Sequence, residues 1–142
     1  MTESGTIRDL VARIAAVAPG AEATAELDGE RLTFGGLAAR VNSWCDRIPA
    51  GARRVAVHCA NDNDNVARIC AVWQSGASAV LLGALLPAAE AQRRVVESCS
   101  DAVLGRDDIA AELAPGDSPA EPDEILVVCS PLAPPVVLRA RY

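Results

Sequence analysis

The chain has 142 residues, of which 51% are hydrophobic and only 3% aromatic, and its formal net charge is −6. This length suits one domain with a buried core, so we expect a single domain over 1–142. All 13 cationic residues are arginine and form no basic stripe, so we expect neither nucleic acid nor an anionic membrane as a partner.

The five cysteines are widely spaced and form no CxxC pair, so we expect no metal site. Each lies in an apolar segment, where a free thiol behaves as a small hydrophobic group. The N-terminus has no basic region followed by an apolar core, and the longest apolar stretch, 77–86, is too short to span a bilayer. We therefore expect a cytoplasmic protein with no membrane segment.

The first part of the chain predicts two helices and a hairpin. Apolar residues at helical spacing predict an N-terminal helix within 1–20. A hairpin is predicted over 23–34, around an Asp-Gly turn pair. A second helix follows over 36–48, and a Pro-Ala-Gly segment ends it.

The segment 36–113 contains the most regular pattern in the chain. Strands are predicted at 54–59, 77–82 and 102–104, helices at 65–75 and 87–98, and one or two helical turns at 107–113. Strands that alternate with helices indicate an α/β fold, with a mostly parallel sheet flanked by helices.

The chain closes with a loop and two terminal strands. An acidic, proline-rich loop is predicted over 114–124. Within 125–142, an apolar strand at 125–128 runs into a turn with three prolines, and a second apolar run follows. That run consists of Val136, Val137 and Leu138.

Four segments, in this order, resemble the N-terminal subdomain of adenylate-forming enzymes. This family includes acyl-CoA synthetases, luciferases and the adenylation domains of peptide synthetases. The segments are LTFGGL at 32–37, RRVAV at 53–57, AVWQSGA at 71–77 and LLP at 85–87, the last followed by Glu90 and Arg93. No single segment is specific, but the ordered series is, and it implies the fold of that subdomain in a truncated form.

The resemblance also aligns 127–130 with the strand that enters the phosphate-binding loop of the family. Of the loop's threonines, serine, glycines, proline and lysine, only Ser130 and Pro134 or Pro135 match here, and the chain has no lysine. Glycines let the backbone approach phosphate closely, whereas prolines remove amide donors. The resemblance therefore implies no autonomous ATP-dependent adenylate formation and no cofactor, and it disfavours an enzyme without settling the question.

A few residues remain as weak candidates for chemistry at the carboxyl ends of the strands, where open α/β sheets bind ligands. His58 is the one histidine and would suit a general base, although a hydrogen-bonded sheet histidine is the commoner case. Asn61 and Asp62 follow the same strand as candidates for ligand binding, with helix capping the better interpretation. Cys129 and Ser130 end the last strand, but no nucleophile-elbow motif surrounds them.

These observations favour a non-catalytic protein that acts through protein–protein association. The apolar run Val136–Val137–Leu138 would form the interface, because the family packs a further subdomain against this one. The partner would be a second copy, giving a homodimer, or a separately encoded biosynthetic enzyme. The alternative is a small enzyme or ligand-binding protein that reuses the scaffold, and a decayed gene product also remains open.

Overall fold

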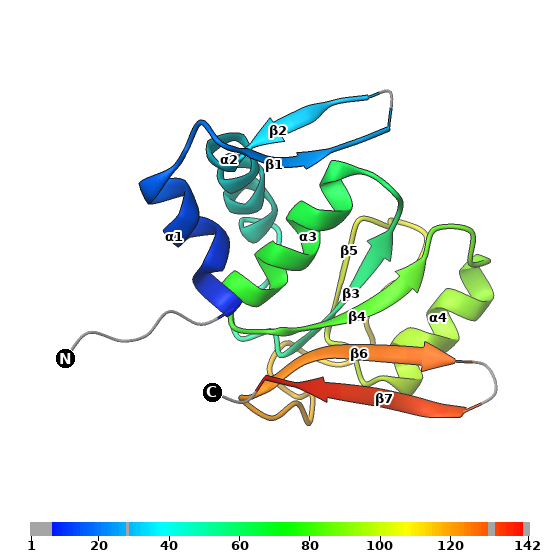
Figure 1. The fold of residues 1–142 in the computed structure, drawn as a ribbon. Helices are drawn as coiled ribbons and strands as arrows, with labels where there is room; N and C mark the ends of the chain where they lie inside the picture. Colours follow the sequence, from blue (N-terminus) through cyan, green and yellow to red (C-terminus); the bar gives the residue numbers. More distant parts are fainter. Residues whose placement is uncertain (1–6, 28, 131–132, 141–142) are drawn as a thin grey trace.

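The structure is a computed structural model that describes residues 7–27, 29–130 and 133–140 (Figure 1). Its helical elements are the 3₁₀ turn η1 (Ile7–Asp9), α1 (Leu10–Val17), α2 (Phe34–Cys45), α3 (Asn63–Gln74) and α4 (Ala88–Glu97). Its strands are β1 (Glu22–Ala25), β2 (Arg31–Thr33), β3 (Arg54–Cys59), β4 (Ser78–Gly83), β5 (Ala102–Leu104), β6 (Glu124–Ser130) and β7 (Ala133–Arg139).

The main sheet has five strands in the order β5-β3-β4-β6-β7. β3 pairs in parallel with β4 and β5, and β4 pairs in parallel with β6. Only β7 runs antiparallel, as the second arm of a hairpin with β6. The predicted α/β fold with a mostly parallel sheet is confirmed, and β1 and β2 form the predicted hairpin as a separate antiparallel pair.

The β3–α3–β4 unit follows directly from its sequence. Apolar residues occupy both faces of β3 and β4, which lie covered in the middle of the sheet. Asp62 is the N-cap of α3, where its side chain accepts a hydrogen bond from the backbone of Asn65. Gly76 follows the helix at a φ of 84°, in the left-handed region that glycine adopts readily.

Helices cover the two faces of the sheet (Figure 1). On one face Val72 of α3 packs with Val55 and Val57 of β3. On the other face Ala91 and Val95 of α4 pack with residues of β3, β4 and β6. α2 lies outside α3 and contacts it through a third apolar cluster, so the core is layered around the sheet.

The prediction of helical turns over 107–113 is wrong. This segment is irregular, although Ile109 is buried in the core beside α4. The side chain of Gln92 donates to the carbonyl of Ala110 at 2.8 Å and accepts from its backbone N–H at 2.9 Å. Because both backbone groups of Ala110 are bonded to a distant side chain, they are not available for a helix.

Pro134 and Pro135 lie within strand β7 rather than in a turn. β7 is an edge strand, and its pairing with β6 shifts register between Val128 and Ser130, opposite the prolines. An edge strand with an irregular ladder tolerates residues that lack an N–H group. Pro131, the third proline of the predicted turn, lies outside the described residues.

Candidate functional site

The candidate residues at the carboxyl ends of the strands form two separate groups. His58, Asn61 and Asp62 lie at or after the end of β3, whereas Cys129 and Ser130 end β6. β4 lies between these two strands. Since neighbouring strands are about 4.8 Å apart, the groups are separated by about 10 Å. The structure therefore does not bring His58 within hydrogen-bonding distance of Ser130 as a base for a nucleophile.

His58 is half-buried, and it lies beside a tight turn after β5. Its Nδ1 atom is buried without a hydrogen-bond partner among the described residues. Gly105 sits next to it at a φ of 90°, and a Cβ there would lie 3.1 Å from the His58 Cβ. Across this turn, hydrogen bonds from Arg106 lower the pKa of the Asp108 carboxyl, and the charge of His58 contributes to a smaller extent.

Asn61 and Asp62 line a cavity of about 400 Å³ between the β1–β2 hairpin and the start of α3. Its other walls include Thr24 and Glu26 of the hairpin segment. The hydroxyl oxygen of Thr24 is buried and has no hydrogen-bond partner within the described part of the chain. The cavity therefore has a wall of mixed polar and apolar side chains, and one buried hydroxyl in this wall lacks a hydrogen bond.

The start of α3 is not an open anion site, because carboxylates already occupy its amide donors. The Asp62 side chain accepts from the N–H of Asn65 at 2.8 Å, and Glu26 accepts from the N–H of Asn63 at 3.0 Å. These two negative charges at the positive end of the helix dipole disfavour a bound phosphate. The predicted capping role of Asp62 is confirmed, and the capping role of Glu26 had no local signal in the sequence.

Cys129 and Ser130 offer little for nucleophilic catalysis. Burial raises the pKa of the Cys129 thiol, and Glu97 adds to this rise while Arg94 opposes it. A raised pKa leaves little thiolate at neutral pH, and the thiolate is the nucleophile. Ser130 lines a hollow of about 500 Å³ between α4 and β7, together with Arg93, Arg94 and Glu97.

The predicted interface residues differ in their exposure. Val136 and Leu138 are 54% and 43% exposed, whereas Val137 packs inward against the cluster under α4. Val128 of β6 pairs directly with Val136 and is 41% exposed. We call the surface made by Val128, Val136 and Leu138 the β6–β7 face. Sequence reasoning missed Val128, although strand alternation, once the pairing is known, places it beside Val136.

Comparisons with solved structures match this arrangement of elements. The N-terminal domain of FACL13 from Mycobacterium tuberculosis matches with a TM-score of 0.73 at 19% identity, over 96% of this chain and 44% of that chain. A fatty acyl CoA synthetase from Mycobacterium tuberculosis matches with a TM-score of 0.70 at 20% identity, over 94% of this chain and 34% of that one. The chain has the fold of the N-terminal subdomain of adenylate-forming enzymes.

A nonribosomal peptide synthetase, FmoA3, matches in the same way, with a TM-score of 0.71 at 17% identity, over 98% of this chain and 18% of that chain. The resemblance in the sequence is thus confirmed at the level of the adenylate-forming fold. The chain spans less than half the length of each of these proteins. No protein-family profile matches it, and no curated protein matches it.

The described residues of this fold lack both a cluster of metal-binding side chains and a helix suited to a membrane. In the ranges 7–27, 29–130 and 133–140, no group of three or more histidine, cysteine or acidic side chains is arranged to hold a metal ion. None of the helices in these ranges combines the length and the apolar character needed to cross a bilayer.

Proposed function

We propose that this chain acts through protein–protein association and not through adenylate formation, and that its partner is a second copy of itself. The observation that carries the proposal is the β6–β7 face. Three apolar side chains stand on neighbouring strands, each more than 40% exposed. Contiguous apolar surface of this kind favours burial against another protein.

The sequence around this face supports a role without catalysis. The segment 125–142 contains no glycine, and the chain contains no lysine, so the residues that would hold ATP phosphates by analogy with the fold are missing. Within that segment, β6 nevertheless pairs with β4 on one side and with β7 on the other. The hairpin thus has a structural role in the sheet while it lacks the groups for phosphate binding.

The face suits self-association better than the edge of the sheet does. Pro134 and Pro135 remove amide donors from β7, which hinders edge-to-edge pairing. The face carries no charge of its own, and the nearby Arg139 is paired with Asp123 at 3.1 Å. Two copies can therefore meet through it without like-charge contact, although the chain has a net charge of −6.

Light scattering coupled to size exclusion tests this proposal. We expect the unmodified chain to be a homodimer and the double variant Val136→Glu/Leu138→Glu to be a monomer, because two-fold symmetry would bring the new charges together. Leu85→Glu is the matched control, since Leu85 is 98% exposed outside this face and its variant should remain dimeric. A monomeric unmodified chain, or a double variant that stays dimeric, would refute self-association.

The other partner that fits this face is a separately encoded biosynthetic enzyme. The solved chains that share the fold continue for more than half of their length beyond the matched part. A complementary enzyme would cover the β6–β7 face in the same way as a second copy. Co-purification with the product of a neighbouring biosynthetic gene, lost in Val136→Glu/Leu138→Glu, is the expected result.

The free cysteines support placing this association in the reducing cytoplasm.

A small-molecule site beside the end of β3 is the second candidate function. It is favoured by the cavity next to Asn61, whose wall includes the unpartnered Thr24 hydroxyl. A thermal-shift screen of metabolites would then find a stabilising compound whose effect is lost in Asn61→Ala. Because Asn61 is exposed, this variant should keep the fold. A screen without any stabilising compound would remove this candidate.

A further inference from the structure

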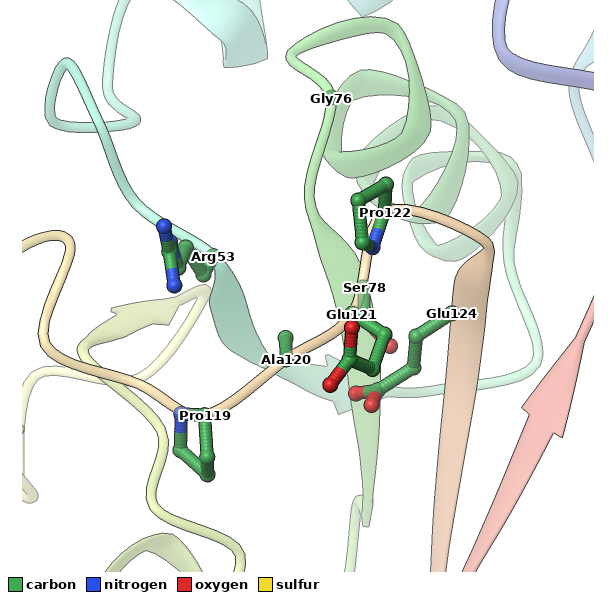
Figure 2. Close-up of a pocket in the computed structure, with 8 residues that line it drawn as sticks. All are labelled: Arg53, Gly76, Ser78, Pro119, Ala120, Glu121, Pro122 and Glu124. Atoms are coloured by element: carbon green, nitrogen blue, oxygen red, sulfur yellow. The ribbon is translucent and has the colours of Figure 1, made fainter.

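A third hollow lies at the opposite end of the sheet, where its parallel strands begin. Figure 2 shows it between the start of β3, the start of β4 and the loop that leads into β6. Its volume is about 400 Å³, which is within the range of about 300 to 1,000 Å³ typical of small-molecule sites. Arg53, Ser78 and Glu121 are among the residues that line it.

Buried hydrogen bonds hold the frame of this cavity. The Asp101 carboxylate, 2% exposed, accepts from the backbone N–H groups of Arg53 at 3.2 Å, Arg54 at 3.3 Å and Gly116 at 2.9 Å. On the far side, the guanidinium of Arg54 makes two hydrogen bonds to Glu124. The proline-rich loop is therefore tied to the sheet at both of its ends, so the cavity has fixed walls.

A positive group stands on one side of the cavity. The guanidinium of Arg53 donates one hydrogen bond, from Nη1 to the carbonyl of Ser118 at 3.3 Å. Within the described residues it makes no ion pair, in contrast to the neighbouring Arg54. Its remaining donors are free to take up a carboxylate, which guanidinium groups bind in a two-pronged geometry.

Negative groups stand on the other side. Glu121 is exposed, and its carboxylate has no ion-pair partner within the described residues. Glu124 forms part of the same wall, and Figure 2 labels both side chains on this side of the cavity. Arg54 pairs with Glu124, and the guanidinium of Arg8 donates to the backbone carbonyls of Pro122 and Glu124 at 3.1 and 2.9 Å. The carboxylate of Glu121 can therefore accept hydrogen bonds from an ammonium group.

A buried hydroxyl completes the site. Ser78 is only 1% exposed, and its Oγ atom has no hydrogen-bond partner among the described residues. In Figure 2 its side chain lies behind the carboxyl groups of Glu121 and Glu124. An unsatisfied buried hydroxyl destabilises the fold. A donor on a bound molecule would satisfy it.

We propose that this cavity binds a small zwitterion, with the carboxylate on Arg53 and the protonated amine on Glu121 beside Ser78. A free α-amino acid is the simplest molecule with both groups a few ångströms apart. The carboxylate of Glu121 would repel a simple anion, and the guanidinium of Arg53 would repel a simple cation. A molecule with only one of the two charges therefore does not match the site. The site is separate from the β6–β7 face, so its test does not depend on self-association.

A titration of ¹⁵N-labelled protein with glycine tests the proposal. We expect saturable chemical-shift changes confined to amides around the cavity, including those of Gly76 and Ser78. Acetate and methylammonium, which each supply one half of glycine, should bind at least about tenfold more weakly. The absence of saturable shifts with glycine, or equal affinity for acetate, would overturn the proposal.

Three variants assign the roles. Arg53→Gln and Glu121→Gln should each weaken glycine binding at least about tenfold. Arg31→Gln, which changes an exposed arginine of the hairpin, is the matched control and should leave binding unchanged. Ser78→Ala should weaken binding between about two- and tenfold while the ligand-free fold stays as stable or becomes more stable. Unchanged binding in both Arg53→Gln and Glu121→Gln would contradict the assignment.

Discussion

Arg54 and Glu124 form a buried, two-pronged ion pair at the beginning of two parallel strands. The Nε atom of Arg54 lies 2.6 Å from Oε1 of Glu124, and Nη2 lies 2.8 Å from Oε2. The Glu124 side chain is 1% exposed and that of Arg54 is 12% exposed. The hydrogen bond to Glu124 raises the pKa of Arg54 despite its burial, so the guanidinium of Arg54 stays charged in the folded chain.

The first prediction is that Glu124→Gln destabilises the fold by about 3 to 5 kcal/mol. The substitution leaves the buried charge of Arg54 without a counter-charge, and this penalty exceeds the loss of one hydrogen bond. Urea unfolding followed by circular dichroism measures the change in the free energy of unfolding. Asp123→Asn, which breaks the exposed pair with Arg139, is the control and should lower stability by at most about 1 kcal/mol.

A double variant separates the charge effect from a packing effect. Arg54→Met/Glu124→Leu removes both charges and should recover most of the stability lost in Glu124→Gln, because apolar side chains of similar volume replace buried ion pairs well. A double variant less stable than Glu124→Gln would contradict this account of the pair.

The second prediction concerns the cap of α3. Asp62→Ala should lower the free energy of unfolding by about 1 kcal/mol, because the N–H of Asn65 loses its acceptor. Asp62→Asn keeps an oxygen at the cap and should lose much less. Comparable losses in the two variants, measured by urea unfolding, would show that the contribution comes from the charge opposite Arg68 and not from capping.

Much of the central fold was predictable because its signals are local. β3 begins and ends at the predicted residues, since alternating apolar side chains define a strand and a polar turn ends it. Asp62 lies between that strand and an apolar helical repeat, so its capping role was visible in the sequence. The order of these elements was enough to identify the fold that the structural comparisons show.

The rest depends on contacts between residues distant in sequence. Arg54 and Glu124 are 70 positions apart, and each by itself reads as an exposed charge. The irregular segment at 107–113 is set by the side chain of Gln92, which no local pattern reveals. Val128 joins the exposed face only because β6 pairs with β7 in one register. Candidate sites built from such contacts cannot be read from single segments.

The third prediction addresses Cys129. Because burial raises the pKa of its thiol, iodoacetamide should label it at least about threefold more slowly at neutral pH than a thiol of ordinary pKa. Raising the pH from about 7 to about 10 should keep increasing the rate, without levelling off where an ordinary thiol does. Peptide mass spectrometry measures this profile, with glutathione as the reference thiol. Fast labelling at pH 7 would restore Cys129 as a candidate nucleophile.

The fourth prediction is that the two prolines of β7 protect the edge of the sheet. Pro134→Thr/Pro135→Thr restores two amide donors on an exposed edge strand, so we expect assembly beyond the dimer that increases with concentration. Light scattering over a dilution series measures this assembly. Ala133→Thr is the control, since it raises strand propensity in β7 without adding a donor, and it should scatter like the unmodified chain. If the proline variant scatters like the unmodified chain, the edge is protected by other means. The argument that copies associate through the β6–β7 face and not through the β7 edge would then lose its main support.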